Sequence, residues 1–97
     1  MKAVFMSCNQ SMYEDVLQIV KDLEINGFTG WEELIGSGSR GGEPHLGSHA
    51  WPTMNSALIS VMDDEKAEMF LSRIQQLDEK NPEQGMRAFA WEVTKMI

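Results

Sequence analysis

The prediction of the fold starts from one run of sequence, Ser56-Ala57-Leu58-Ile59-Ser60-Val61-Met62. The run is almost continuously apolar, which is typical of a strand that lies in the middle of a sheet. Asp63 and Asp64 follow it and end the apolar pattern, and either carboxylate can cap a helix that begins there. We therefore expect a central strand over residues 56–62 that leads directly into a helix.

The segment before this strand begins with a strand and a helix. Residues 2–8 form a short apolar run of strand character. Ser11 and Glu14 have the spacing of a capping box, which predicts that a helix starts at Ser11. Apolar residues recur at helical spacing up to Ile25, and Asn26-Gly27 resembles a left-handed helix end. The sequence therefore predicts a helix that ends near Ile25.

The remaining elements are two strands and the helix that follows the central strand. Residues 31–35 are a candidate strand between the first helix and the central strand. The second helix is predicted to end at Asn81-Pro82, and residues 86–93 form a fourth candidate strand. This helix carries an apolar stripe made of Ala67, Phe70, Leu71, Ile74 and Leu77.

The order of these elements is strand, helix, strand, strand, helix, strand. It predicts an α+β, ferredoxin-like βαββαβ fold, in which a four-stranded antiparallel sheet carries both helices on one face. The other face is left bare. Four large apolar side chains on the strands could line it, so we expect copies of the chain to cover it: Trp31, Met62, Phe89 and Trp91.

Length and charge limit the kind of protein. Ninety-seven residues form one domain, and 8 basic against 15 acidic residues give a net charge of −7. Nucleic acid is not an expected partner, because binding to phosphates depends on clustered Lys and Arg. A single cysteine argues against a disulfide-stabilised secreted domain and predicts the cytoplasm. The apolar start is too short for a signal peptide, and no run is long enough for membrane insertion.

A long glycine-rich loop over about 36–55 separates the second and third strands. Glycine occupies positions 36, 38, 41, 42 and 47. A structureless stretch of this length is uncommon in so small a domain and more often has a function. The loop is therefore the first place where we expect a site.

The loop holds both histidines of the chain, His45 and His49. Imidazole is a common metal ligand, Glu43 could add an oxygen ligand, and Cys8 is a soft ligand for copper(I) or zinc. The alternative is that the histidines only bond loop backbone or face solvent, and that Cys8 is a small buried hydrophobic residue. Pro44 argues against a helix that would place both rings on one face.

Signatures of catalysis are missing from the sequence. It has no Gly-x-Ser-x-Gly elbow and no complete phosphate-loop lysine motif. Glu32 and Glu33 are neighbours on a strand and point to opposite faces, so they cannot act as an acid–base pair. We expect a protein that is not an enzyme.

The layout and two local motifs resemble the nitrogen-regulatory PII and PII-like family. The motifs are Gly27-Phe28-Thr29 at the entry to the second strand and Gly36-Ser37-Gly38-Ser39-Arg40-Gly41-Gly42 at the root of the long loop. The resemblance covers almost the whole chain and implies a ferredoxin-like homotrimer whose long loop is the family's T-loop. It also implies ligand contacts at the cleft between subunits, made by Gly36, Gly38, Ser39 and Arg40.

The chain departs from the PII pattern at two places. The second phosphate loop is reduced to Asn81-Pro82-Glu83-Gln84-Gly85-Met86 and has no lysine, and Thr94-Lys95-Met96-Ile97 replaces a pair of arginines. Few cations then remain to offset the charge of a triphosphate. We expect a less charged ligand or a metal ion, divalent or copper, rather than a nucleotide.

Three functions are consistent with these observations. The first is a PII-like protein that responds to a small ligand or metal and whose loop controls a partner, such as a membrane transporter or efflux pump. The second is a ferredoxin-like trimeric metal-binding or cation-tolerance protein without a signalling role. The third is a structural subunit that only mediates assembly.

Overall fold

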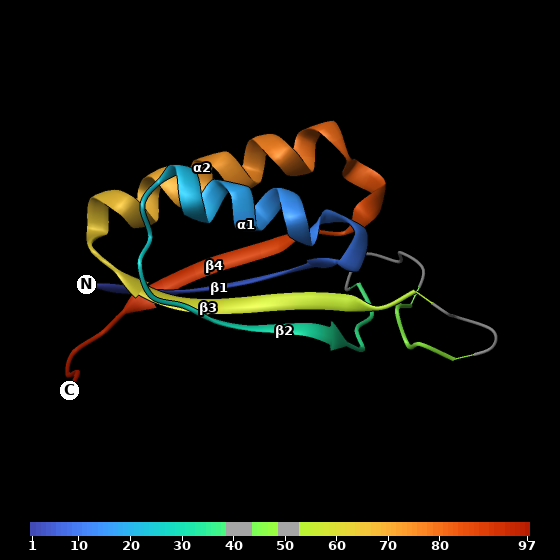
Figure 1. Ribbon diagram of the computed structural model, residues 1–97, viewed down its shortest axis with the longest axis horizontal. Helices are drawn as coiled ribbons and strands as arrows, with labels where there is room; N and C mark the ends of the chain where they lie inside the picture. The colour runs from blue at the N-terminus through green and yellow to red at the C-terminus, as the bar shows by residue number, and fades with distance from the viewer. Residues whose placement is uncertain (39–43, 49–52) are drawn as a thin grey trace.

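The chain folds into one four-stranded sheet covered by two helices (Figure 1). The computed structural model describes residues 1–38, 44–48 and 53–97. The strands lie side by side in the order β2-β3-β1-β4, and every pair is antiparallel. The elements in chain order are β1 (Lys2–Asn9), the 3-10 turn η1 (Gln10–Met12), α1 (Tyr13–Asp22), β2 (Thr29–Leu34), β3 (Asn55–Met62), α2 (Asp64–Lys80), the 3-10 turn η2 (Pro82–Gln84) and β4 (Arg87–Glu92).

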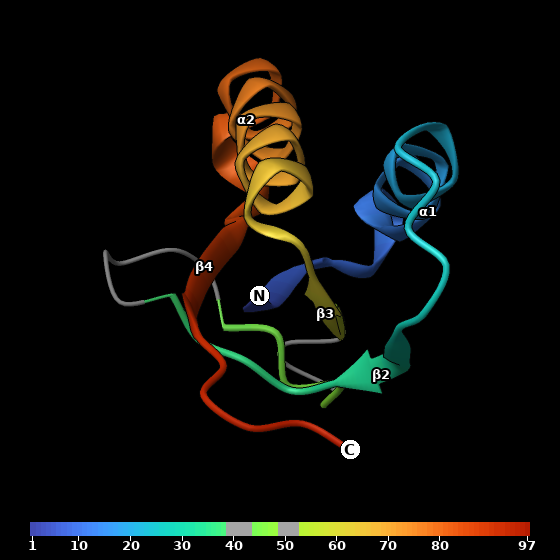
Figure 2. The same cartoon turned by 90° about the vertical axis from the view of Figure 1, so that its left-hand side faces the viewer.

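Both helices lie on the same face of the sheet, as Figure 2 shows from the end of the molecule. We call this face the covered face and the opposite one the open face. The predicted ferredoxin-like fold is therefore confirmed, including the central position of the 56–62 strand. Among the helices of the described residues, none is long and apolar enough to cross a membrane.

The hydrophobic core fills the covered face. In the β1–β3 register Met6 lies opposite Leu58 and Cys8 opposite Ser56, and cross-strand partners share a face. Met6 and Leu58 are fully buried and pack against Phe70 of α2 in one apolar cluster. This cluster accounts for the cohesion of the single chain, since burial of apolar surface is the main favourable term in folding.

The open face carries an aromatic row. Phe5 pairs with Phe89 across β1 and β4, with ring centroids 5.5 Å apart, and the Phe89 and Trp91 rings are 5.8 Å apart. Phe89, Trp91 and Trp31 are each 41 to 51 % exposed. The prediction for Met62 is wrong, because Met62 is buried in the core cluster on the covered face, opposite Lys2.

The two ends of α1 differ from the sequence prediction. No capping box forms at Ser11. Instead, Asn9 Oδ1 accepts a hydrogen bond from the Ser11 amide at 2.9 Å, and a 3-10 turn precedes α1. The helix ends at Asp22 rather than near Ile25, and the left-handed residue is Glu24, with φ of 56°, rather than Asn26 or Gly27.

The end of α1 is a Schellman motif. The Glu24 amide donates to the Lys21 carbonyl and the Ile25 amide to the Val20 carbonyl, both at 3.0 Å. Val20 and Ile25 are both buried, which is the apolar contact that usually accompanies this motif. The chain therefore turns away from α1 three residues earlier than the position of Gly27 suggests.

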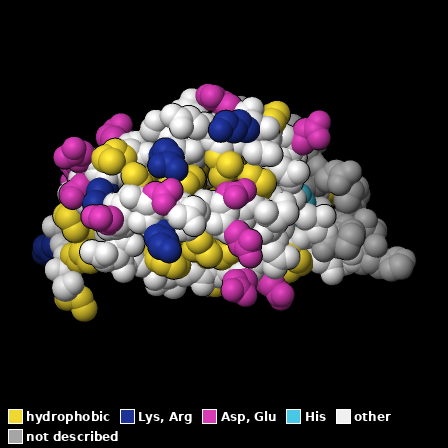
Figure 3. Space-filling model, turned by 45° about the horizontal axis from the view of Figure 1, so that its top comes forward, with side chains coloured by type: hydrophobic (Ala, Val, Ile, Leu, Met, Phe, Trp, Pro, Cys, Tyr) yellow, Lys and Arg dark blue, Asp and Glu magenta, His cyan; other side chains and the backbone are white. Residues whose placement is uncertain are grey.

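The predicted cap of the second helix is confirmed. Asp63 Oδ1 accepts from the Lys66 amide at 2.7 Å, and the helix ends at Lys80, directly before Asn81-Pro82. The outer surfaces of the helices are polar and acidic residues are spread over them (Figure 3).

The strand β2 begins at Thr29, two residues before the predicted start. Thr29 and Gly30 pair with Ile59 and Leu58 of β3. A side chain at Gly30 has no room, because an added Cβ would lie 2.2 Å from the hydroxyl oxygen of Tyr13. That hydroxyl donates to the Ala57 carbonyl at 3.0 Å, so α1, β2 and β3 meet at this point.

Candidate ligand site at the root of the long loop

A polar hollow lies at the end of the sheet from which the long loop leaves. Here β1 ends at Asn9, β3 begins at Asn55 opposite it, and η2 follows the end of α2. The hollow has a volume of about 550 Å³. It is lined by Asn9, Gln10, Ser11, Thr53, Met54 and Gln84, so the ends of β1, the loop and η2 contribute together.

The first residues after β1 are fixed by hydrogen bonds. Asn9 caps the η1 turn through its side chain, and the Gln10 amide donates to the Met54 carbonyl at 3.0 Å. The Gln10 side chain donates through Nε2 to the Glu32 carbonyl, also at 3.0 Å. One wall of the hollow is therefore rigid and connected to both sides of the long loop.

Three other lining side chains make no hydrogen bond of their own to the part of the chain that the structure describes. No hydrogen bond of the Ser11, Thr53 or Gln84 side chain is found to another residue of the described ranges. Ser11 is exposed, whereas Thr53 and Gln84 are half-buried. A pocket lined by a few converging polar groups is the usual form of a site for a small ligand.

The long loop is closed near its root by a short pairing of its own. The Gly36 amide donates to the His45 carbonyl at 2.6 Å, and the His45 amide donates to the Gly36 carbonyl at 2.5 Å. His45 Nδ1 lies 2.5 Å from Asn55 Oδ1. A Cβ at Gly36 would lie 2.1 Å from Asn55 Nδ2, so a larger residue here would displace the Asn55 side chain. Gly36, His45 and Asn55 thus form one contact cluster, which we call the loop clasp.

The predicted ligand residues are only partly within the described ranges. Gly36 belongs to the loop clasp, where its close contact is with Asn55, and Gly38 is exposed. Ser39 and Arg40 lie outside the described residues. Their role in ligand contact stays a prediction.

The predicted metal ligands fall into three different positions. His45 is half-buried in the loop clasp, and Glu43 and His49 lie outside the described residues. Cys8 is fully buried in the core, where desolvation raises the pKa of its thiol to about 12. Within residues 1–38, 44–48 and 53–97 no three His, Cys, Asp or Glu side chains come together as a metal-binding group.

Sequence reasoning missed most of the hollow. The sequence predicts Ser11 as part of a capping box, and Thr53 and Gln84 carry no motif of their own. Asn55 was missed as the partner of His45, because their contact depends on how the loop returns to β3. One usable signal exists: Asn9 and Gln10 are consecutive polar residues at the end of an apolar strand, where side chains can serve a site instead of the core.

Solved structures with this arrangement include PII-like proteins. CPII from Thiomonas intermedia, a nitrogen regulatory PII-like protein whose structure holds ADP, AMP and bicarbonate, superposes with a TM-score of 0.76 at 17 % identity. A protein of Thermus thermophilus described as a PII-like signalling protein superposes with a TM-score of 0.69 at 27 % identity. In both comparisons 95 % of this chain is covered, against 84 % of CPII and 85 % of the Thermus protein.

This fold also occurs in proteins that are not PII-like. A de novo designed protein also superposes, with a TM-score of 0.56 at 11 % identity over 95 % of this chain and 97 % of its own. No family profile matches the sequence, and no curated protein matches it either. The architecture is therefore ferredoxin-like, and this chain shares it with CPII, with the Thermus protein and with the designed protein.

Proposed function

We propose that the chain is a PII-like regulatory protein that assembles as a homotrimer and changes the conformation of its long loop when a small ligand enters the polar hollow. The observation that supports this most is the position of the hollow. Its lining residues Thr53 and Met54 belong to the returning end of the loop, while Gln10 contacts Glu32 just before the loop begins. A ligand at this position touches the loop root directly.

Ligand binding can shift the loop because few contacts hold the root. Within the described ranges the returning side of the root is held by the loop clasp, by the bond from the Gln10 amide to the Met54 carbonyl and by a longer bond of 3.3 Å from the Gly47 amide to the Thr53 carbonyl. A ligand that binds one arrangement of Thr53 and Met54 better than another stabilises that arrangement by the difference in affinity. The altered loop would then act on a partner such as a transporter, without catalysis.

The expected ligand carries less charge than ATP. The net charge of the chain is −7, and η2 offers Pro82-Glu83-Gln84 where a phosphate loop would need a cation. Arg87 follows at the start of β4, but an acidic protein offsets a triphosphate poorly. CPII holds ADP, AMP and bicarbonate, so AMP and bicarbonate are the first ligands to test.

Calorimetric titration with bicarbonate, AMP, ADP and ATP tests this proposal. We expect AMP or bicarbonate to bind more tightly than ATP, and Gln84→Ala and Ser11→Ala to weaken the binding about tenfold, as expected when a hydrogen-bonding partner is lost. Gln76→Ala, an exposed change on α2, serves as the matched control and keeps wild-type affinity. Binding that neither hollow variant weakens would place the ligand elsewhere.

A metal-binding role is the second candidate, supported by the contact between His45 and Asn55. When Asn55 Oδ1 accepts the proton of Nδ1, the tautomer of His45 is fixed and Nε2 presents its lone pair. Carbonyl groups orient metal-ligating histidines in this way. His49 and Glu43 of the same loop would complete the set, whereas Cys8 would reach it only if the core opened.

Titration with zinc and copper distinguishes this candidate. We expect His45→Ala/His49→Ala to abolish binding and Asn55→Ala to weaken it about tenfold or more, since partners of ligating residues contribute 10- to 100-fold to metal affinity. Equal binding by wild type and the double variant would exclude the histidine site.

A further inference from the structure

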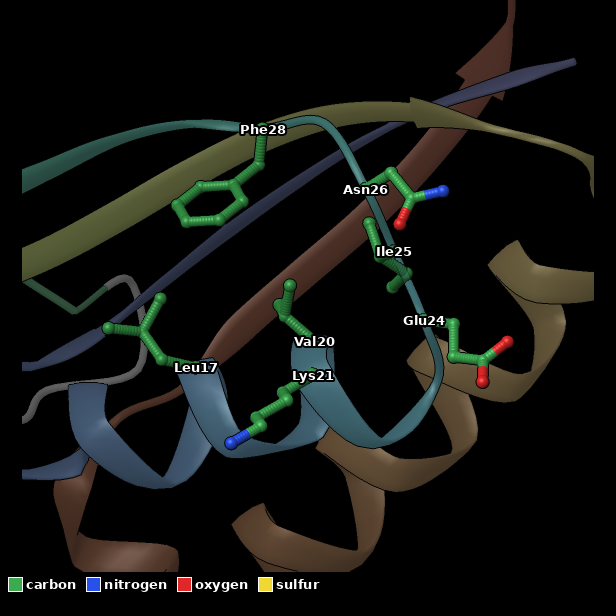
Figure 4. A pocket seen from close by; sticks show the side chains of 7 residues that line it. All are labelled: Leu17, Val20, Lys21, Glu24, Ile25, Asn26 and Phe28. Atoms are coloured by element: carbon green, nitrogen blue, oxygen red, sulfur yellow. The ribbon is translucent and has the colours of Figure 1, made fainter.

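A second hollow lies at the opposite end of the molecule, between α1 and the start of β2 (Figure 4). It is an open groove with a volume of about 690 Å³. Four apolar side chains form its floor and walls, namely Leu17, Val20, Ile25 and Phe28. In Figure 4 the Phe28 ring points from the β2 side toward Leu17 and Val20 on α1.

The groove is a fixed feature of the fold. The Schellman motif after α1 fixes the position of Glu24 at the end of the groove. Lys66 Nζ of α2 donates to the Glu24 carbonyl at 2.6 Å. The Ser60 hydroxyl donates to the Gly27 carbonyl, which holds the connection against β3. Phe28 is nevertheless 46 % exposed, so one wall of the groove lies open to solvent.

The segment after β4 has the complementary features. Val93 is held by a bond from its amide to the Met1 carbonyl at 3.1 Å, and Thr94 to Ile97 then leave the sheet. We call these four residues the tail. Met96 is 64 % exposed and Ile97 fully exposed, so both lie outside the hydrophobic core of their own chain.

One charge of each sign, Glu24 and Lys21, borders the groove, and the tail carries Lys95. Glu24 is exposed at the groove and Lys95 is exposed next to the two apolar tail residues. Seating Met96 and Ile97 against the apolar wall would therefore bring Lys95 toward Glu24. Such a pair adds specificity to a contact whose main driving force is apolar burial.

The tail cannot reach the groove of its own chain. Four residues span at most about 14 Å when fully extended. Three strand spacings of about 4.8 Å already separate β4 from β2, and the groove lies beyond β2 on the covered face. The tail leaves on the open side of the sheet, as Figures 1 and 2 show. A tail seated in this groove would therefore come from a second copy.

We infer that the tail of one copy docks into the groove of the next, a contact that rests on the proposed homotrimer and assigns part of its interface. The contact joins two different surfaces, and such head-to-tail contacts close into rings when the rotation permits. The groove and the tail lie at the same end of the molecule (Figure 1), as a ring requires if its axis runs along the molecule.

Cysteine trapping tests this docking. Cys8 is the one cysteine of the chain and is fully buried, so it does not react. An Asn26→Cys variant mixed with a Met96→Cys variant is expected to give a disulfide-linked pair of chains under mild oxidation, whereas neither variant gives one alone. Met69→Cys on the outer surface of α2 replaces Asn26→Cys as the control and should not be trapped.

Charge exchange provides an independent measurement. Glu24→Lys and Lys95→Glu should each raise the dissociation constant of the assembly about two- to fivefold, and the double variant should restore it. Replacing Met96 and Ile97 by serine should raise it tenfold or more, because apolar burial is lost. Glu65→Lys, an exposed change on α2, should leave it unchanged.

The outcomes separate this inference from the proposed function. A trapped mixed pair with restoration by the double charge variant supports docking. A wild-type trimer that gives no trapped pair overturns docking and leaves the proposed function intact. A wild-type monomer overturns both the docking and the proposed trimer, while ligand titration still decides whether the hollow binds.

Discussion

The two faces of the sheet are built from alternating residues of the same strands, yet one is buried under the helices and the other is exposed to solvent. On β1, Met6 faces the helices and is fully buried, whereas its neighbour Phe5 faces the open side. On β4, Ala88 and Ala90 pack against the core, whereas Phe89 and Trp91 are about half exposed. The core between the sheet and the helices is completed within one chain, whereas the open face leaves its aromatic row exposed.

This difference indicates that the open face, and not the core, is where copies of the chain would associate. Large exposed aromatic patches are unusual on proteins that stay monomeric and often mark interfaces. A 97-residue domain also buries only a modest part of its surface, so self-association adds apolar burial that the chain lacks. We therefore expect substitutions on the covered face to change stability and those on the open face to change assembly.

The largest expected effect comes from Phe70→Ala on the covered face. Phe70 is fully buried in the core cluster, and truncation of such a phenylalanine costs about 3–5 kcal/mol of unfolding free energy. Met69→Ala, its exposed neighbour on α2, should cost less than about 0.5 kcal/mol. Urea unfolding measures both, and similar losses would show that the two sides of α2 do not differ as described.

The next effect separates assembly from folding. Replacing Phe89 and Trp91 by serine should raise the dissociation constant of the assembly about 100-fold, because the aromatic row loses its apolar area. The circular dichroism of the dissociated chains should stay that of a folded domain. Met69→Ser is the control on the helix side, and an assembly that tolerates the open-face variant would exclude this face as the interface.

Gly30→Ala tests how closely the covered face packs at the edge strand β2. The new Cβ would overlap the Tyr13 hydroxyl and displace its hydrogen bond to the Ala57 carbonyl, at a cost of about 1–3 kcal/mol. In a Tyr13→Phe background the same change should cost clearly less, because the overlapping oxygen is gone. Additive losses in the double variant would contradict this contact.

Cys8 gives the smallest expected effect, as a pH dependence of stability. Burial raises the pKa of its thiol from 9.0 to about 12, so the unfolded chain releases this proton at a lower pH than the folded chain. The protection is complete below pH 9 and is lost as the pH rises toward 12. Between pH 8 and pH 10 this single proton should lower the unfolding free energy by about 1.4 kcal/mol.

The comparison with Cys8→Ala isolates that contribution. Other groups titrate in the same range in both proteins, and Tyr13, whose pKa is raised by burial and also by the charge of Cys8, is removed from the comparison by placing both proteins in a Tyr13→Phe background. Parallel pH profiles for wild type and Cys8→Ala would mean that Cys8 is more accessible to water than its burial in the core indicates.

The fold could be predicted from the sequence because the apolar runs mark the strands, the apolar stripes mark the helices, and their order along the chain is that of one known fold class. The limits of β3 and α2 follow from the 56–62 run and from Asp63, which caps the helix as expected. The face of Met62 could not be predicted, because a continuous apolar strand carries no alternation. Its place on the covered face is set by the register with β1.

The candidate site was less predictable, since its contacts join distant residues. Asn9 competes with Ser11 as a cap, because an Asn side chain can bond the amide two residues onward. The loop clasp joins residues 36, 45 and 55, and nothing in their spacing indicates it. The length and glycine content of the loop pointed to the correct end of the sheet, but not to Ser11, Thr53 or Gln84.

The account depends most on the open face as a contact between copies, and sedimentation equilibrium of the wild-type protein at micromolar concentration tests this directly. We predict a single species with three times the chain mass of 11.0 kDa. A stable species of 11.0 kDa, with its aromatic row still exposed to solvent, would contradict the account.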